Sequence, residues 1–427
     1  MYRSILSCAA LASALLLQAQ QQVRQVFVLS EGYYDYFGGG GQLIPVTLGS
    51  YDPAAGTYQT VATLNGPRFG SDVLVDAGSV YVAADDRVVR FDADSYAQTG
   101  EALVPGVRKL AVWNDLLLLT RGELGGLPHY FEARDKATLA LLWTIAPADG
   151  LTMSAEDVLV VGDKAYLAVN NAFDWSSLAG KVGVVDLVAQ AYAQEIDLGP
   201  EGLNPEKLFV RDGAVLTFNN TDFARSSISR LEADAAALEY TVTVAENSGC
   251  ATSALVEAAE MVYFLEYAQG ELVRFDIGAG SVSDTLTGSP TVYGLIEDPV
   301  NGVLYATTTD FVSSGELHVL SLDGQVQSTV PAAIAAGSMA LDLRLSTALP
   351  ERAGAALAVY PNPAEHEVFL QLAAPAGALR VFDSTGREVA VDQGPAGPVR
   401  RLEVAALKPG LYTVQAEGVG TVRFTKR

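Results

Sequence analysis

The sequence is poor in the residues that build metal centres and catalytic relays. Its 427 residues include three histidines, and these are widely separated: His129, His318 and His366. A multi-histidine metal centre and a histidine-based catalytic relay are therefore not expected. No Gly-x-Ser-x-Gly nucleophile elbow is present, and the glycine run at 38–41 lacks the Lys-Ser/Thr that follows in a phosphate loop.

Long apolar segments and cysteines are also scarce. The one extended apolar run, residues 5–17, follows Arg3 and ends in a glutamine-rich flank. It is too short to span a bilayer stably and predicts a secretory signal peptide at residues 1–20, with no transmembrane segment after its removal. Of the two cysteines, cleavage leaves Cys250 alone. The mature chain is then expected to have no internal disulfide.

Basic residues are few in most of the chain. The sequence has 27 Lys and Arg against 50 Asp and Glu, a net charge of −23. From Ala355 onward the counts are 8 against 7, whereas the preceding residues hold 19 against 43. So acidic a surface repels phosphate backbones, which excludes nucleic acid as a partner.

What the sequence does contain is a short apolar strand that recurs seven times. The copies lie at 26–29, 79–83, 116–120, 165–169, 215–218, 261–265 and 303–307. Their spacing is typical of four-stranded propeller blades, whose period is roughly 40 to 50 residues. The first copy lacks a leading strand, which residues 340–345 could supply and so close the ring. We predict an all-β fold: a seven-bladed beta-propeller at 24–346, with six or eight blades as alternatives, and a small C-terminal beta-sandwich.

Three stretches strengthen the propeller prediction. They are VFVLSEG (26–32), RFDAD (90–94) and GLNPEKLFV (202–210). With the repeat, they resemble YncE-like surface beta-propellers of Gram-negative bacteria. Propellers of this kind include outer-surface proteins that capture cobalamin or other large nutrients, so the resemblance implies a fold and, more loosely, ligand binding.

After a linker at 347–356, the pattern changes to three motifs in a fixed order. They are Tyr360-Pro361-Asn362-Pro363, then Asp383-Ser384-Thr385-Gly386-Arg387, then Leu407-Lys408-Pro409-Gly410-Leu411-Tyr412 with a basic Thr425-Lys426-Arg427 end. Together they resemble the type A C-terminal sorting domain of the type IX secretion system, over residues 357–427. The resemblance implies recognition by that secretion machinery and a secreted or outer-surface location. The motif positions that carry it are Pro361, Asn362, Pro363, Gly386, Arg387, Gly410, Leu411, Tyr412, Lys426 and Arg427.

Four connections between the second and third strands of a blade share an aspartate followed by an aromatic residue. The pairs are Asp35-Tyr36, Asp174-Trp175, Asp222-Phe223 and Asp310-Phe311. In one interpretation the aspartate fixes a turn and the ring pins the loop. In the other, the rings form the base of a ligand-binding site on one propeller face, and the flexible Gly38–Gly41 run lets the first loop extend over that site. The candidate ligand-binding residues are Tyr33, Tyr34, Asp35, Tyr36, Phe37, His129, Tyr130, Asp174, Trp175, Asp222, Phe223, Tyr267, Asp310 and Phe311.

These patterns favour an exported binding protein over an enzyme, with no catalytic residue assigned and no cofactor expected. The expected ligand is a small or medium organic molecule or a glycan. Two alternatives remain: a Ca²⁺-assisted hydrolase of lactones or glycans that uses the loop aspartates, and a scaffold for a partner protein. The sequence does not name the ligand.

Overall fold

The computed structural model describes residues 20–36, 38–174, 176–221, 224–232, 234, 237–246, 252–346, 358–371, 378–393, 399–416 and 420–427. The chain divides into two compact units, one of Gln21–Arg344 and one of Leu345–Arg427 together with Met1–Gln20. The predicted signal peptide, up to residue 19, and the predicted linker lie outside the described residues. No helix within these ranges is long and apolar enough to cross a membrane.

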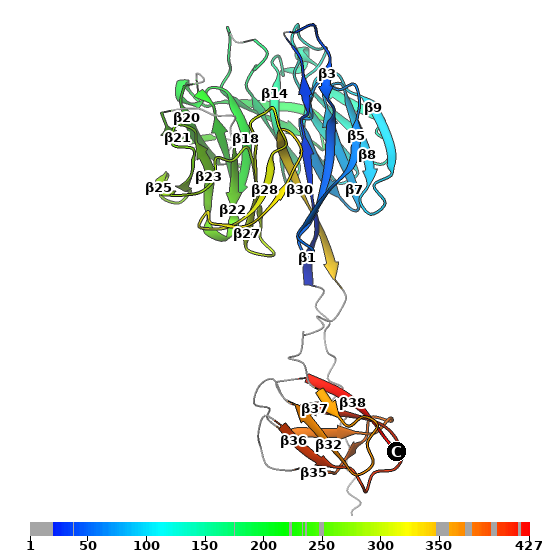
Figure 1. The fold of residues 1–427 in the computed structure, drawn as a ribbon. Coiled ribbons are helices and arrows are strands. Elements are labelled where there is room, and N and C mark those ends of the chain that lie inside the picture. The colour runs from blue at the N-terminus through cyan, green and yellow to red at the C-terminus, as the bar shows by residue number, and fades with distance from the viewer. Residues whose placement is uncertain are drawn as a thin grey trace, which may run out of the picture. The chain divides into compact units, whose positions relative to one another are not determined.

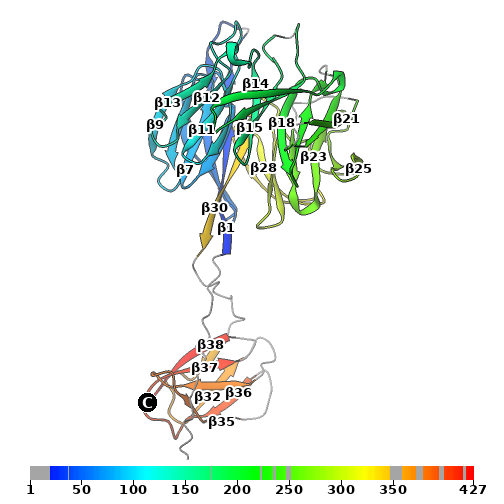
Figure 2. The same cartoon turned by 180° about the vertical axis from the view of Figure 1, so that it is seen from behind.

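The described part of the first unit forms seven four-stranded sheets (Figures 1 and 2). The first sheet has the order β30 (Ala336–Ser346), β1 (Gln20–Ser30), β4 (Val46–Asp52), β5 (Thr57–Leu64). The second has β6 (Asp72–Asp76), β7 (Ser79–Ala84), β8 (Arg87–Asp92), β9 (Gln98–Leu103). The third has β10 (Val107–Trp113), β11 (Leu116–Arg121), β12 (Phe131–Asp135), β13 (Leu141–Ile145). The fourth has β14 (Ala155–Val161), β15 (Lys164–Val169), β16 (Lys181–Asp186), β17 (Ala191–Asp197).

The remaining three sheets repeat the same order of four consecutive strands. The fifth has β18 (Pro205–Arg211), β19 (Ala214–Asn219), β20 (Ser226–Glu232), β21 (Ala237–Ala245). The sixth has β22 (Ser253–Val256), β23 (Met261–Glu266), β24 (Glu271–Asp276), β25 (Ser281–Leu286). The seventh has β26 (Gly294–Asp298), β27 (Val303–Thr308), β28 (Glu316–Ser321), β29 (Val326–Pro331). A separate ribbon pairs β2 (Tyr33–Tyr34) with β3 (Gln42–Ile44).

The recurring apolar strand occupies the second position of every sheet. Its copies are β1, β7, β11, β15, β19, β23 and β27. Their central residues are at most 2% exposed: Val28, Tyr81, Leu118, Leu167, Leu216, Tyr263 and Tyr305. In the first sheet, β30 from the far end of the unit pairs with β1, and both views show the two strands side by side (Figures 1 and 2). That pairing covers an edge of β1 that would otherwise be open.

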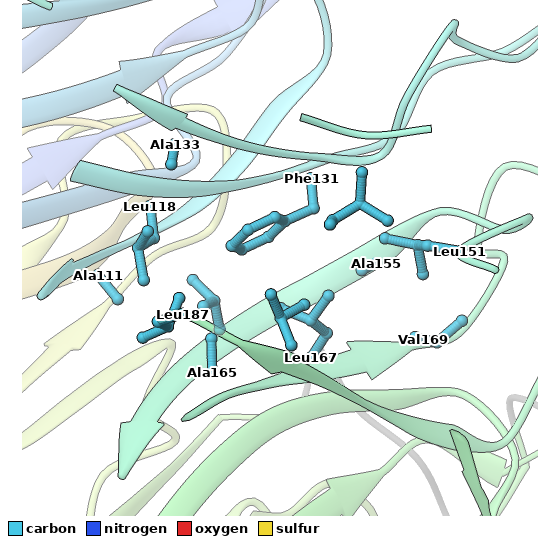
Figure 3. Packing of buried hydrophobic residues seen from close by; sticks show 13 residues of the cluster. Ala111, Leu118, Phe131, Ala133, Leu151, Ala155, Ala165, Leu167, Val169 and Leu187 are labelled. Atoms are coloured by element: carbon cyan, nitrogen blue, oxygen red, sulfur yellow. The ribbon is translucent and has the colours of Figure 1, made fainter. Parts of the chain in front are cut away.

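Apolar side chains of adjacent sheets pack against each other. In one cluster, Leu118 and Phe131 from the third sheet contact Leu167 and Val185 from the fourth. Figure 3 shows the Phe131 ring pointing into this layer. Phe131 is fully buried, so truncation to alanine would cost about 3–5 kcal/mol. The sheets therefore hold together through strand pairing within each one and apolar contacts between them.

The second unit contains two four-stranded sheets within its described residues. One has the order β31 (Ala358–Tyr360), β32 (Glu367–Gln371), β36 (Val399–Glu403), β35 (Asp392–Gln393). The other has β34 (Glu388–Val389), β33 (Leu379–Phe382), β37 (Gly410–Ala416), β38 (Gly420–Lys426). Val368 and Leu402 of the first join Val414 and Phe424 of the second in one buried cluster.

The sorting motifs make contacts inside this second unit. Asn362 accepts a hydrogen bond from the Thr425 amide at 2.9 Å, which joins the Tyr-Pro-Asn-Pro stretch to β38. Asp383 caps its own turn, accepting from the Thr385 amide at 2.9 Å. The Tyr412 hydroxyl donates to the Lys408 carbonyl at 2.9 Å. These motif residues therefore stabilise the fold of the second unit, in addition to any part they have in recognition by the secretion machinery.

Candidate functional site

A cavity of about 1020 Å³ lies among the innermost strands of the first unit. Every sheet contributes lining residues from its first strand, and these strands are β6, β10, β14, β18, β22, β26 and β30. Its wall carries seven acidic residues, Glu31, Asp72, Glu156, Asp157, Glu206, Glu257 and Glu297, but three basic ones, Arg108, Lys109 and Lys207. We define this space as the central cavity.

Some of the acidic groups complete the fold. The inner strands have an edge toward the cavity, and its backbone donors need partners. Asp72 accepts a hydrogen bond from the Leu110 amide of the neighbouring sheet at 2.9 Å. Asp157 accepts one from the Leu208 amide at 2.8 Å in the same manner. These two carboxylates therefore link adjacent inner strands.

Arg108 and Glu156 form a bidentate ion pair in the cavity wall. The guanidinium donates to the two carboxylate oxygens at 2.7 and 2.8 Å. It also lies over two rings, 5.5 Å from the centroid of Phe69 and 5.6 Å from that of Phe173. Burial alone would raise the pKa of Glu156, but Arg108, with smaller contributions from Lys109 and Lys207, outweighs burial and the net pKa is lowered. Both oxygens of Glu156 are occupied, so the pair is a rigid part of the wall.

Glu206 and Glu31 feel the charge of Arg108, but neither forms an ion pair with a described residue. Glu206 accepts from the side-chain amides of Asn204 at 3.0 Å and Asn220 at 3.2 Å. Burial, and then the charge of Glu156, raise the pKa of Glu206 to about 7. Glu31 accepts a hydrogen bond from the Tyr293 hydroxyl. Its pKa is raised by burial, a shift that the hydrogen bond only partly offsets.

A second group of charges surrounds Lys207. Burial, followed by the charge of Lys109, lowers the pKa of Lys207, while Asp157 and Asp72 oppose that shift. Lys109 donates to the Ser71 carbonyl at 2.6 Å. Burial raises the pKa of Asp157 to about 6 despite both lysines. The formal charges of the two aspartates and the two lysines in this group sum to zero.

The predicted loop aspartates satisfy their own turns. Asp35 accepts from the Gly38 amide at 2.5 Å. Asp174 accepts from the Ser176 amide at 3.2 Å and from two serine hydroxyls. Asp310 accepts from the Val312 and Ser313 amides at 2.9 and 2.7 Å, and these bonds lower its pKa to about 2. All three contacts agree with the turn interpretation.

The predicted aromatic residues are mostly exposed. Tyr33, Tyr36, Tyr267 and Phe311 are 45%, 56%, 60% and 46% exposed. Tyr34 and Tyr36 contact each other with ring centroids 4.8 Å apart. Of the predicted residues that the structure describes, Tyr267 alone lines the central cavity. An indirect link exists through Phe311, whose ring packs edge-on against the cavity residue Tyr293 at 4.9 Å.

The His129-Tyr130 pair does not line the cavity. His129 contacts Glu132 at 2.7 Å, and Glu132 also pairs with Arg121 and Arg134. This ion cluster lies within the third sheet and explains the histidine without a ligand. His318 is 6% exposed on β28 and contacts the Thr329 hydroxyl at 2.9 Å.

Four predicted site residues lie outside the described residues: Phe37, Trp175, Asp222 and Phe223. Within the described ranges, no group of three or more His, Cys, Asp or Glu could hold a metal ion. Calcium binding by the loop aspartates therefore stays a prediction.

Sequence reasoning missed the cavity residues, although a signal was present. Arg108-Lys109, Glu156-Asp157 and Glu206-Lys207 are adjacent charged pairs at the start of three inner strands. Each pair precedes one copy of the recurring apolar strand. Charges at the same place in several repeats, beside a strand that faces the ring centre, would have indicated the site.

Comparison with known proteins bears on each unit separately. Residues 358–427 match the family model described as "Secretion system C-terminal sorting domain". This match confirms the sorting prediction: the domain indicates export by type IX secretion, to the cell surface or as a secreted protein, and implies contact with that machinery. No curated protein sequence matches the chain.

Three similar solved structures are distant in sequence from this chain. Hydrazine synthase from Kuenenia stuttgartiensis shares 12% identity with a TM-score of 0.52, covering 63% of this chain and 88% of that one. BamB from Moraxella catarrhalis shares 10% with a TM-score of 0.44, covering 88% and 99%. A chain of a nidogen/laminin complex shares 10% with a TM-score of 0.43, covering 74% and 98%.

The likeness to hydrazine synthase concerns the fold alone. The likenesses to BamB and to the nidogen/laminin chain have lower TM-scores and carry no argument. Repeated four-stranded sheets and an all-β chain are consistent with a beta-propeller. The class of protein is therefore an exported, propeller-type chain with a type IX sorting domain.

Proposed function

We propose that this protein is a seven-bladed propeller that captures a small or medium polar organic ligand, such as a glycan, at the outer cell surface or after secretion. In this proposal the signal peptide at 1–20 starts export, and the sorting domain, a small sandwich, completes it. The likeness to YncE-like surface propellers remains part of the proposal.

The observation that carries the proposal is the central cavity. At about 1020 Å³ it is large enough for a medium-sized ligand. Its polar groups are held in fixed positions by Arg108–Glu156 pairing and by the amides on Glu206. Fixed polar groups with aromatic neighbours such as Phe69 and Tyr267 are typical of sites for polyhydroxylated ligands.

A cavity-filling variant of the full chain tests the proposal. Ala172 lines the cavity without an ionic role, so Ala172→Trp should occupy the ligand space. Ala189→Trp places the same ring on an exposed turn and is the matched control. Thermal-shift measurements would use oligosaccharides, corrinoids, haem and lactones, with and without Ca²⁺, and a Tyr33/Tyr34/Tyr36→Ala variant alongside.

The expected result is a compound that raises the melting temperature of the parent and of Ala189→Trp but not of Ala172→Trp. Loss of the effect in the tyrosine variant as well would add the loop to the site. Stabilisation that survives in Ala172→Trp would remove the cavity from the proposal. No stabilisation by any compound would favour the partner-protein alternative.

One observation favours a second function, hydrolysis. Glu206 and Glu156 line the same cavity with pKa values shifted in opposite directions, which is the arrangement expected of a general acid beside an ionised carboxylate. In this alternative Glu206 would protonate a leaving group. Product release from glycans or lactones, abolished by Glu206→Gln, would support it. Binding without turnover would leave the capture function in place.

A further inference from the structure

The charges of the central cavity fall into two groups that differ in balance. Around Lys207, two lysines face two aspartates. Arg108 faces Glu31, Glu156 and Glu206, and the lysines that face the two aspartates also act on Glu31 and Glu156, so three cations serve five carboxylates. Glu297 is occupied elsewhere, because it accepts from the Glu257 amide of a short 3-10 turn at 2.6 Å. The Arg108 group therefore lacks positive charge.

The fourth and fifth sheets each place an asparagine beside the cavity, but the two side-chain amides differ in whether they have a partner. Asn220 directly follows β19, and its side-chain amide donates to Glu206 on β18. Asn170 directly follows β15 in the same way, but Glu156 on β14 is taken by Arg108. The side-chain nitrogen of Asn170 consequently has no partner within the described residues.

Asn170 is 1% exposed and lines the cavity. A buried amide donor without a partner costs about 1–3 kcal/mol. The nitrogen is closed off from the cavity in the unliganded protein, so a turn of this amide toward a ligand acceptor would relieve that cost. Glu206 uses one carboxylate oxygen for both asparagine amides. Its other oxygen has no hydrogen bond within the described part of the chain and can accept from a ligand.

We propose that the ligand carries a primary ammonium group with a neighbouring oxygen, as in an amino sugar or amino alcohol, and that Glu206 and Glu31 bind the ammonium while Asn170 donates to the oxygen. This inference rests on the proposed capture function. The ammonium supplies the missing cation to the Arg108 group. The acidic surface of the whole chain, −23 in net charge, also attracts cations toward the cavity.

Alternative occupants fit less well. A carboxylate or phosphate ligand would meet the uncompensated charges of Glu31 and Glu206 and would find Arg108 already paired. The Lys207 ammonium donates no hydrogen bond to a described residue, but Asp157 and Asp72 already balance the charges of Lys207 and Lys109. A bare metal ion lacks a cluster of three ligands among these residues.

Isothermal titration calorimetry of the full chain with glucosamine tests the inference, with N-acetylglucosamine and glucose as matched neutral probes. Glucosamine should bind at least tenfold more tightly than either neutral sugar. Glu206→Gln and Glu31→Gln should each weaken glucosamine binding about tenfold or more, and Asn170→Ala should weaken it less. Glu101→Gln, an exposed acid of an outer strand, is the charge-matched control and should leave binding unchanged.

A second readout separates ion pairing from general damage to the cavity. Glu206 has a pKa of about 7 in the free protein, so at pH 7 it is about half protonated. Pairing with an ammonium should release roughly half a proton, seen as an enthalpy that depends on the buffer. Glu206→Gln should remove the part of this release that comes from Glu206, so the buffer dependence should fall in that variant and persist in Glu101→Gln.

The outcomes distinguish the inference from the function on which it rests. Equal binding of glucosamine and N-acetylglucosamine, or tight binding retained in Glu206→Gln, would overturn the ammonium subsite. Binding of a neutral glycan that Ala172→Trp abolishes, without any binding of glucosamine, would overturn the subsite but leave capture standing. No binding of any probe would overturn both.

Discussion

Replacing Glu206 by glutamine should make the first unit more stable at alkaline pH. Burial and the nearby Glu156 raise the pKa of Glu206 from 4.5 to about 7. A carboxyl whose pKa is higher in the folded chain binds more protons when folded, so stability falls as the pH rises from the unfolded value to the folded one. Below about pH 4.5 the group costs nothing, and above about pH 7 its cost is complete.

The size of this cost follows from the shift. A change from 4.5 to about 7 corresponds to about 3 kcal/mol, and we expect 2–3 kcal/mol because the cavity admits some screening. Glutamine cannot ionise, and its carbonyl oxygen can still accept from Asn204 and Asn220. With about 2.1 cal/mol/K of unfolding entropy per residue, a gain of about 2–3 kcal/mol raises the melting temperature of a unit of this size by about 3 to 4 °C.

Thermal unfolding of parent and variant at pH 5 and pH 8.5 measures the effect. The two proteins should melt within about 1 °C of each other at pH 5, and Glu206→Gln should melt higher at pH 8.5. The difference in melting temperature between parent and variant at each pH removes the contribution of other titrating groups, such as Asp157, that both proteins share. Glu101→Gln should show no pH-dependent gain. A variant that is less stable at pH 8.5, or a difference that does not change with pH, would refute the electrostatic account of Glu206.

Three further predictions concern the ion pair, the loop and the second unit. Arg108→Met should lower the free energy of unfolding by about 3–5 kcal/mol in chemical denaturation, since it leaves Glu156 buried without a cation. Adding Glu156→Gln should restore part of that stability. A loss below about 1 kcal/mol in Arg108→Met alone would contradict this. Tyr36→Ala should change stability by no more than about 0.5 kcal/mol, because the ring is 56% exposed; a larger loss on unfolding would show that the ring packs. Deleting residues 358–427 should leave the melting of the first unit unchanged but abolish export in cell fractionation, and a deleted chain found outside the cell would contradict the sorting assignment.

The strands could be predicted from sequence because their signal is local. An apolar run such as 165–169 is recognisable by itself, and its recurrence gives the spacing of the sheets. The sorting motifs were equally local. Asn362 and Asp383 fix turns within a few residues or against the last strand, so a short pattern carries the information.

The cavity is harder to predict than the strands because its residues come from distant parts of the chain, and only the recurrence of charged pairs in several repeats indicates it. Arg108 and Glu156 are far apart in sequence, and neither looks unusual at the start of a strand. They become a buried pair once the inner strands of seven sheets line one space. The loop aspartates attracted attention for the opposite reason. Asp310 followed by an aromatic residue is conspicuous in the sequence, yet the amides of its own turn account for its carboxylate.

The inner wall itself shows which charges the fold requires. Asp72 and Asp157 hold backbone amides of the next inner strand, so their loss would leave donors unpaired. Other inner strands place Ser253 or Gly294 on the same wall, without charge. The fold therefore tolerates neutral residues there, and with the pKa of Glu206 raised to about 7 we expect its charge to cost stability in the unliganded protein. Glu206, which pairs with no described cation and leaves one carboxylate oxygen unbonded, is therefore the group on this wall that a cationic ligand would stabilise most.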